Sequence, residues 1–316
     1  MRAFVLTKPG VATNLELKEI PSPQIADNEL LIRTRAISIN PVDVKTREGI
    51  GFYAMIKDND PLVLGWDISG IVEKVGEHAG DFKVGDEVFG MVNFPGYAKA
   101  YAELVAAPAS QMAIKPGNIS FGEAAASTLA ALTAYQVLVK TAKIKSFQKI
   151  LISAASGGVG HFAAQLAKHL GAYVIGSSSE NNREFVLSLG VDEHVNYKGT
   201  ELENLIGNLD FALDAVGGEN TERLLPLVKK GGMLVTIPTT LSESALALAA
   251  THGVDAQFLL VKSNGEDMAA IAELLSSGVL KPYVSKSFPF EQLPQAHLAV
   301  ETGRSVGKVV VLLPEN

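Results

Sequence analysis

The chain has 316 residues, of which 47% are hydrophobic and 19% charged, and it contains no cysteine. The length allows two domains, and the apolar fraction is that of a globular core rather than of a disordered chain. The lack of cysteine excludes disulfides, thiolate metal sites and a cysteine nucleophile. A formal charge of −7 is the opposite of the basic footprint of a nucleic-acid-binding protein.

The sequence offers no segment typical of membrane insertion. The first apolar run ends at Lys8–Gly10, too early for the core of a secretion signal. The longest weakly polar stretch, Ala124–Val139, is shorter than the roughly 20 residues that cross a bilayer. We therefore expect a soluble, cytoplasmic protein with neither a membrane nor a nucleic acid as partner.

The first third of the chain is predicted to be rich in β-strands, because alternating or β-branched segments are separated by prolines and glycines. The expected strands are Arg2–Thr7, Leu15–Ile20, Glu29–Ser38 and Ile68–Val75, with one more after the turn at Val84–Gly90. From about residue 123 the pattern takes the period of helices, and the first helix is expected from Gly122 to Val139.

Strands and helices then alternate, which is typical of parallel βαβ units. The expected strands are Lys149–Ala154, Tyr173–Gly176, Phe211–Asp214 and Met233–Ile237, and the helices Gly158–Leu170, Arg183–Leu189 and Thr221–Lys230. Leu241–Ala250 fits a helix or a loop. The last helix, Asp267–Ser276, precedes a closing strand, Gly307–Leu313, which is expected to return to the N-terminal part. The predicted domains are thus 1–122 completed by 263–316, and 123–262.

The turn after the first of these strands is predicted to bind a dinucleotide. It follows an apolar strand and opens a helix, whose N-terminus attracts phosphate. Gly157 would let the backbone approach a pyrophosphate, Gly160 would allow the helix to pack closely, and Ala155 stands where a first glycine is usual. The alternative is a tight turn in another doubly wound protein. The predicted cofactor contacts are Ala155, Ser156, Gly157, Gly158, Val159 and Gly160.

The tip of the second strand predicts NADPH rather than NADH. No carboxylate stands there to bind the 2′-hydroxyl group of the ribose, and Ser177, Ser178 and Ser179 are followed by Glu180 and Arg183. Serine hydroxyls and an arginine suit a 2′-phosphate, whereas Glu180 does not. The other interpretation is that the serines cap the next helix and Arg183 faces water.

The chain resembles the zinc-free quinone oxidoreductase (zeta-crystallin-like) branch of the medium-chain dehydrogenase/reductase superfamily over nearly its whole length. The resemblance implies an α/β fold, in which a Rossmann domain with a doubly wound parallel sheet interrupts a GroES-like β-barrel substrate domain. It places the active site in the cleft between the domains and suggests a homodimer, for which Rossmann edge strands such as Met233–Ile237 are candidates for pairing. The matching stretches, in the expected order, are Asn40–Lys45, Gly65–Val72, Val84–Val88, Leu132–Tyr135, Ala154–Gly160 and Gly307–Val310.

The same comparison predicts a protein without a metal. Trp66 and Asp67 follow Gly65 where zinc-dependent relatives carry Gly-His-Glu, and a chain without cysteine has no cysteine ligand. The six histidines are not paired at the spacing of helical metal ligands. Without a Lewis acid, the expected reaction is reduction of a quinone or of an α,β-unsaturated carbonyl (an enone or 2-alkenal). The sequence does not separate these substrates. The other hypothesis is an NADPH-binding sensor or partner-binding protein with little turnover.

The resemblance also places Asn40, Asp43 and Lys45 at the active site. Asn40 would donate its amide to a substrate oxygen or position the nicotinamide, and Asp43 would orient a neighbouring group. Lys45 would stabilise an oxyanion or bind the cofactor. Asn40-Pro41 is equally a common helix-entry dipeptide, and Lys45 fits a solvated helix surface. Tyr53 would stack on a ring, donate a proton or only close a hydrophobic lid.

Further cofactor contacts are implied by the resemblance. Thr133 matches a position beside the nicotinamide, or bonds back to its own helical turn. Trp66 is expected in the cleft wall or core, and Lys308 is interpreted as structural. The remaining contacts would approach the ribose and the nicotinamide from loops and from the segment that crosses between the domains: Val216 and Gly217, Pro238, and Phe258 and Leu260.

Overall fold

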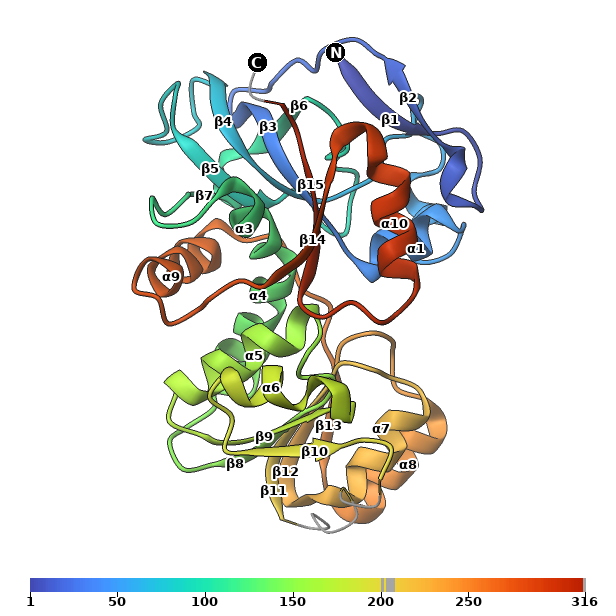
Figure 1. Ribbon diagram of the computed structural model, residues 1–316, viewed down its shortest axis with the longest axis vertical. Helices are drawn as coiled ribbons and strands as arrows, with labels where there is room; N and C mark the ends of the chain where they lie inside the picture. Colours follow the sequence, from blue (N-terminus) through green and yellow to red (C-terminus); the bar gives the residue numbers. More distant parts are fainter. Residues whose placement is uncertain (200–201, 203–207, 315–316) are drawn as a thin grey trace. The chain divides into compact units, whose positions relative to one another are not determined.

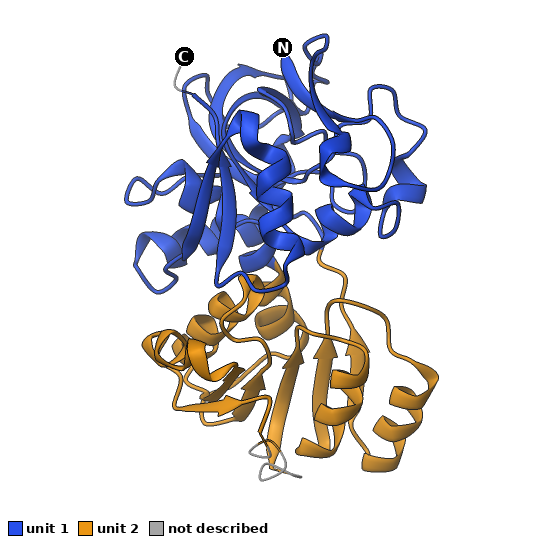
Figure 2. Cartoon of the chain, turned by 45° about the vertical axis from the view of Figure 1, so that its right-hand side comes forward, with its two compact units in different colours: residues 1–132, 262–316 blue, residues 133–261 orange. Residues whose placement is uncertain are grey.

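The computed structural model describes residues 1–199, 202 and 208–314, and the chain divides into two compact units (Figure 2). Unit 1 contains Met1–Leu132 and Lys262–Asn316, and unit 2 contains Thr133–Val261. The C-terminal segment returns to unit 1 as expected, because β15 (Lys308–Leu312) pairs antiparallel with β3 (Glu29–Ile39).

Unit 1 is built on a seven-stranded sheet (Figure 1). Its strands follow one another as β14 (Val284–Pro289), β15, β3, β4 (Asp67–Val75), β5 (Glu87–Met91) and β7 (Met112–Ile114), and β6 (Leu104–Pro108) also pairs with β3. Neighbours are antiparallel apart from β14 and β15. A separate antiparallel pair consists of β1 (Arg2–Leu6) and β2 (Leu15–Glu19). The β-rich first third is therefore confirmed, while β6, β7 and β14 are strands that the sequence pattern did not reveal.

The helices of unit 1 cover both faces of this sheet. Because side chains alternate along a strand, Ile39 and Val311 point to the face of the main core, where they are buried with Leu293. On the other face, the Ser69 hydroxyl donates to the Phe121 carbonyl at 2.6 Å. The helices are α1 (Pro41–Arg47), α2 (Tyr53–Ile56), α3 (Phe121–Ala126), α9 (Gly265–Ser276) and α10 (Leu293–Glu301), with 3-10 turns at Ala12–Asn14, Ala109–Gln111 and Phe290–Gln292.

The helix expected from Gly122 to Val139 is interrupted. It ends as α3 at Ala126 and resumes as α4 (Leu129–Tyr135), followed by a π-helical turn at Gln136–Thr141. The Ser127 and Thr128 hydroxyls bond back to carbonyls of the preceding turn at 2.8 Å each, which competes with continuation of the helix. The backbone N–H of Leu129 then donates to Asp67 Oδ1 at 3.1 Å.

Unit 2 contains a parallel six-stranded sheet in the Rossmann order, β10-β9-β8-β11-β12-β13 (Figure 1). The chain runs outward from β8 to β10 and returns to β11 beside β8. In open parallel sheets, ligands bind at the carboxyl ends of the strands where the order reverses. The bounds are β8 (Lys149–Ile152), β9 (Tyr173–Ser178), β10 (Glu193–Asn196), β11 (Leu209–Asp214), β12 (Val228–Thr236) and β13 (Asp255–Phe258).

Two expectations for this unit were wrong. Val228–Lys230, expected at the end of a helix, begin β12. The same strand, containing Met233–Ile237 in large part, is not an edge strand because β13 pairs with its outer side. The edges of the sheet are β10 and β13. The helices are α5 (Gly158–His169), α6 (Arg183–Ser188), α7 (Glu219–Leu224) and α8 (Glu243–His252), with 3-10 turns at Glu180–Asn182 and Leu225–Leu227.

The ambiguous segment Leu241–Ala250 is largely the helix α8. Ser242 is its N-cap and accepts from the Ala245 N–H at 3.1 Å, and Gly253 ends it in a left-handed conformation at φ +64°. No helix in the described ranges has the length and apolar character needed to cross a bilayer.

Candidate active site and cofactor site

The turn between β8 and α5 leaves little room for side chains. A Cβ on Gly160 would lie 2.1 Å from the Ala154 carbonyl oxygen, so a larger residue would push α5 away from the strand. Gly157 is the N-cap of α5 in extended conformation, and a Cβ there would lie 3.2 Å from the same oxygen. The turn is tied to the next strand by the Ala155 N–H, which donates to the Ser177 carbonyl at 2.9 Å.

This turn fits a pyrophosphate. The first N–H groups of a helix lack partners within it, and the helix dipole places positive charge at the same end. Gly157 keeps side-chain atoms away from that end, and the helix runs on to His169. Ala154 holds the turn in a left-handed conformation at φ +48°, which is costly for a residue with a Cβ and is found mostly at functional sites.

The end of β9 carries the serines predicted to meet the 2′-phosphate, and they differ in accessibility. Ser177 and Ser178 are buried. The Ser178 hydroxyl donates to the Ser179 carbonyl at 3.0 Å and lies 2.8 Å from His194 Nε2. Ser178 is thus engaged within unit 2, whereas Ser179 is partly exposed. His194, sixteen residues further along, is a partner that the sequence did not reveal.

Two further side chains connect this region. Asn182 Nδ2 donates to the Ser156 hydroxyl of the phosphate turn at 3.0 Å, which links the two candidate phosphate-binding loops. Arg183 is about half exposed, and its nearest carboxylate oxygen, in Glu180, is 3.8 Å away. Such a loose, exposed ion pair contributes little, so the guanidinium group remains available for a ligand.

Asp214 organises the loop that follows β11. Its buried carboxylate accepts from the backbone N–H groups of Val216 and Gly217 at 3.0 Å each and from Asn220 Nδ2 at 2.8 Å, all at Oδ1. Oδ2 accepts from the Thr221 hydroxyl at 2.5 Å. One carboxylate therefore holds both residues that were predicted to approach the ribose.

The other predicted cofactor residues follow the next strands. A Cβ on Gly217 would lie 3.4 Å from Pro238, so the loops after β11 and β12 are in contact. Phe258 ends β13 and Leu260 follows it, both partly exposed. These positions share the carboxyl edge of the sheet with the phosphate turn. Thr133 is buried in α4.

Three polar side chains meet inside unit 1, where β3, β4 and β15 are neighbours. Lys308 Nζ donates to Asn40 Oδ1 and lies 4.0 Å from Asp67 Oδ2. Asn40 Nδ2 donates to the same Asp67 oxygen at 2.8 Å. Each of these residues is at most 4% exposed. We call them the Asn40–Asp67–Lys308 cluster.

Each member of the cluster is positioned by the end or the start of a strand. Asn40 directly follows β3 and is the N-cap of α1, with Pro41 at its first turn, so the helix-entry interpretation of this dipeptide is correct. Asp67 begins β4. Gly307 precedes Lys308 at φ +60°, and a Cβ there would lie 2.2 Å from the Tyr283 carbonyl oxygen. Only glycine can therefore bring the chain into β15 at this point.

Burial and charge oppose each other in the cluster. Burial raises the pKa of Asp67, while the Lys308 cation and the hydrogen bond from Asn40 lower it. Burial lowers the pKa of Lys308, while the charges of Asp67 and Asp43 raise it. The effect of burial is the larger one for both residues, so the net pKa of Asp67 is raised and that of Lys308 is lowered. The charged form of each residue is therefore stabilised only by its partners in the cluster.

Asp43 lies beside the cluster and is fully buried. Its Oδ2 accepts from the Asn40 backbone N–H at 2.7 Å, as in a capping box. Burial and repulsion from Asp67 raise the pKa of Asp43 to about 7, against the hydrogen bond from Asn40. The Tyr101 hydroxyl interacts with Asp43 and lies 2.8 Å from His297 Nε2. Burial lowers the pKa of His297 to about 3.

Asp43 is expected to make stability decrease as the pH rises. Its carboxyl pKa of about 7 exceeds the ordinary 3.8, so folding favours the protonated form. The contribution of protonated Asp43 to the free energy of unfolding is complete below about pH 4. It is lost as the pH rises through 7. A shift of this size corresponds to about 4 kcal/mol. Asp43→Asn mimics the protonated acid, so its unfolding free energy should fall less than that of the wild type in this range. Urea unfolding of both proteins measures this, and parallel pH dependences would contradict it.

The other two residues expected at the active site do not join the cluster. Lys45 is exposed on α1, which agrees with the solvated interpretation. Tyr53 is half-buried at the start of α2 and packs against the main core. Trp66 is buried, donates from Nε1 to the Gly96 carbonyl at 2.7 Å and packs edge-on against Phe94, with ring centroids 5.3 Å apart. It belongs to the core, one of the two predicted places.

Asp67, Lys308 and Asp214 are functional candidates that the sequence did not assign. Lys308 is a cation that begins an otherwise apolar strand, and Asp67 follows the only tryptophan. Such positions within apolar runs are a usable signal of a buried charge pair. Asp214 carried a similar signal, since it ends an apolar strand.

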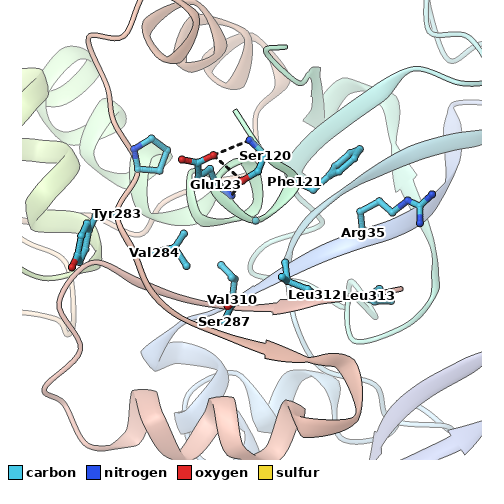
Figure 3. Close-up of a pocket in the computed structure, with 12 residues that line it drawn as sticks. Arg35, Ser120, Phe121, Glu123, Tyr283, Val284, Ser287, Val310, Leu312 and Leu313 are labelled. Atoms are coloured by element: carbon cyan, nitrogen blue, oxygen red, sulfur yellow. Dashed lines mark hydrogen bonds between the residues drawn. The ribbon is translucent and has the colours of Figure 1, made fainter. Parts of the chain in front are cut away.

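A pocket of about 670 Å³ opens elsewhere in unit 1 (Figure 3). Phe121 of α3 and Val310 and Leu312 of β15 line it, between Arg35 and Tyr283 (Figure 3). None of the catalytic or cofactor-binding residues predicted from the sequence lines this pocket. Within the ranges that the structure describes, no three or more His, Asp or Glu side chains are grouped to hold a metal ion.

Two protein-family models match the chain. The alcohol dehydrogenase GroES-like domain matches residues 26–117, and the zinc-binding dehydrogenase model matches residues 189–311. The first match lies within unit 1 and the second covers most of the later Rossmann strands and the C-terminal segment.

Known proteins align with nearly the whole chain. A 2-methylene-furan-3-one reductase from Solanum lycopersicum is 34% identical over 98% of this chain and 79% of its own length. The chloroplastic NADPH-dependent alkenal/one oxidoreductase of Arabidopsis thaliana is 33% identical over the same shares. The solved structure of the quinone oxidoreductase from Coxiella burnetii has a TM-score of 0.93 at 34% identity and covers 99% of each chain. The similarity thus includes both units.

Proposed function

Since the chain belongs to the medium-chain dehydrogenase/reductase superfamily, in the branch of the quinone and alkenal/one oxidoreductases, we propose that it uses NADPH to reduce a quinone or an α,β-unsaturated carbonyl. No zinc takes part in this proposed reaction. The relatives are named for reductions of this kind. Both acceptors are electron-poor, so they can be reduced with help from hydrogen bonds alone.

The observation that most strongly supports NADPH as the cofactor is the shape of one turn in unit 2. It is the turn from β8 to α5, which lies where the strand order reverses: Gly160 leaves no room for a side chain, and Gly157 keeps side-chain atoms away from the N-terminus of α5. Unit 2 would bind NADPH through this turn, the loop held by Asp214, and Ser179 with Arg183. Unit 1 would carry the acceptor.

Bound NADPH would supply the hydride, and the chain's own residues would orient and stabilise the acceptor. As the acceptor is reduced, negative charge grows on its carbonyl oxygen, so a hydrogen-bond donor placed there lowers the barrier. We assign that role to Asn40. Asp43 fixes the backbone of Asn40 by accepting its N–H. Lys45 and Tyr53 remain proposed contacts of the cofactor or acceptor, Lys45 as a mobile cation and Tyr53 as a ring or a proton donor.

We further propose a homodimer in the cytoplasm. β13 is an edge strand with partly exposed residues, and such an edge is suited to pairing with a second copy. This replaces the strand Met233–Ile237 as the candidate for pairing.

Acceptor-dependent oxidation of NADPH tests the proposed reaction. The purified protein is mixed with NADPH and a panel of quinones, alkenals and alkenones, and the nicotinamide absorbance is followed. We expect consumption that requires both protein and acceptor, and comparison of kcat/KM across the panel assigns the substrate class. Tight NADPH binding without consumption across the panel would indicate a binding protein instead and overturn the proposal.

NADPH is expected to bind more tightly than NADH because of Arg183. A hydrogen bond to a charged group contributes about 1.5–3 kcal/mol, so Arg183→Gln should weaken NADPH binding about tenfold or more and leave NADH binding unchanged. Calorimetric titration measures both, with the exposed Arg304→Gln in unit 1 as the control variant. An equal loss for both cofactors would exclude recognition of the 2′-phosphate by Arg183.

A further inference from the structure

Lys308 places a cation where charge is costly. The residue is 4% exposed, and burying an ammonium group costs several kcal/mol unless partners compensate. Its Nζ lies 4.0 Å from Asp67 Oδ2 and 3.4 Å from the Ile39 carbonyl oxygen, and it makes its shortest contact with the neutral amide of Asn40. A lysine that served only to neutralise Asp67 would be expected to contact the carboxylate most closely.

These contacts leave the Asn40 amide with one orientation. An ammonium group only donates and a carboxylate only accepts, so Oδ1 must face Lys308 and Nδ2 must face Asp67. Asn40 is also the N-cap of α1, in a capping box with Asp43. One Nδ2 hydrogen goes to Asp67. The second makes no hydrogen bond with any residue that the structure describes.

We propose that Lys308 is a positioning residue, which holds the Asn40 amide so that its second Nδ2 hydrogen is presented to the carbonyl oxygen of the acceptor. This rests on the proposed function, in which Asn40 is the donor. The ammonium group also polarises the amide through Oδ1, which strengthens Nδ2 as a donor. Without Lys308 the amide can rotate, and Oδ1 would then meet the substrate oxygen as one acceptor meeting another.

A double-mutant cycle separates this role from a purely structural one. Lys308→Met and Asn40→Ala should each lower kcat by roughly tenfold to a hundredfold, in line with the loss of one donor to a developing oxyanion, with unchanged NADPH affinity. Because Lys308 acts through Asn40, the double variant should be no slower than Asn40→Ala alone. Losses in kcat that multiply in the double variant would overturn the proposal. Lys286→Met, an exposed lysine of the neighbouring strand β14, is the control.

A second variant covers the case in which Lys308→Met does not fold, since it leaves Asp67 buried without its cation. Lys308→Met/Asp67→Asn removes both charges and retains an oxygen that can accept from Asn40 Nδ2. It is compared with Asp67→Asn alone. A further fall in kcat in the charge-free pair supports the proposal, and equal kcat values contradict it.

A measurement without substrate or cofactor keeps this test independent of the proposed function. The side-chain amide of Asn40 gives a pair of NMR signals, identified by their loss in Asn40→Ala. Removing Lys308 from the Asp67→Asn background should shift or broaden these signals, whereas unchanged signals would overturn the link between the two residues. If the wild type oxidised no NADPH with any acceptor, the proposed function would fail while this spectrum still decided the role of Lys308.

Discussion

Replacing Gly160 by alanine is expected to weaken NADPH binding by roughly a hundredfold or more. The new Cβ would lie 2.1 Å from the Ala154 carbonyl oxygen and 2.8 Å from the Ala155 Cα. Both are backbone atoms, so the turn or the whole of α5 must move. Overpacking of this kind costs about 1–3 kcal/mol. The displacement also takes the helix N-terminus away from the pyrophosphate, and we expect NADPH affinity to fall by roughly a hundredfold or more, about 2.7 kcal/mol. Calorimetric titration with NADPH measures this loss.

Gly157 provides the matched comparison. Its backbone is extended, and a Cβ there would lie 3.2 Å from the same oxygen, so Gly157→Ala should fold normally. A larger side chain in Gly157→Val should retain the fold but weaken NADPH binding by occupying the space of the phosphate. Gly160→Ala thus tests the close packing of α5 against the turn, and Gly157→Val tests access of the phosphate to the helix N-terminus. Wild-type affinity in Gly160→Ala, or in Gly157→Val, would refute the assignment of this turn.

Replacing Asp214 by alanine is expected to have the second large effect. The carboxylate is fully buried and accepts five hydrogen bonds, two from backbone N–H groups and three from side chains. Each buried donor left without an acceptor costs about 1–3 kcal/mol, and loops of this kind relax in part. We therefore expect the unfolding free energy to fall by about 3–5 kcal/mol and NADPH affinity to fall with it, because Val216 and Gly217 lose their anchor.

Asp210 provides the control for Asp214. It lies at the amino end of the same strand and forms an ion pair with Lys229. Asp210→Ala should leave NADPH affinity unchanged, because the amino end of β11 is opposite the phosphate turn. Urea unfolding and NADPH titration of both variants give the comparison. A folded Asp214→Ala protein with wild-type NADPH affinity would show that the loop after β11 does not contribute to the cofactor site.

The sequence predicted the features that depend on local pattern. The strand, turn and helix around Gly157 and Gly160 could be identified because apolar periodicity and glycine spacing lie within one short stretch. The family and the two-part fold were also correctly predicted, since their motifs recur in a fixed order along the chain. β13, with the sequence Asp-Ala-Gln-Phe, carried no such pattern, and its absence from the prediction made β12 appear to be an edge.

Contacts between distant segments were beyond the sequence. Asn40 and Lys308 are 268 positions apart, and no periodicity connects them. Asn40 was correctly recognised as a helix-entry residue, but its side chain is used for a different purpose than the local pattern suggested. The contacts of Ser178 and Asp67 were not predictable for a similar reason, because their partners come from the neighbouring strand and from α4.

The antiparallel pairing of β15 with β3 has a consequence for how the protein is made. The strand that carries Lys308 follows the whole of unit 2 in the chain, so the ribosome delivers it after unit 2. Until then the C-terminal part of β3, Ala36–Ile39, lacks the partner strand β15, and Asp67 lacks the Lys308 cation. Such an open edge invites pairing with another nascent chain. During translation, unit 2 can therefore fold while the sheet of unit 1 is still incomplete, because β15 has not yet been synthesised.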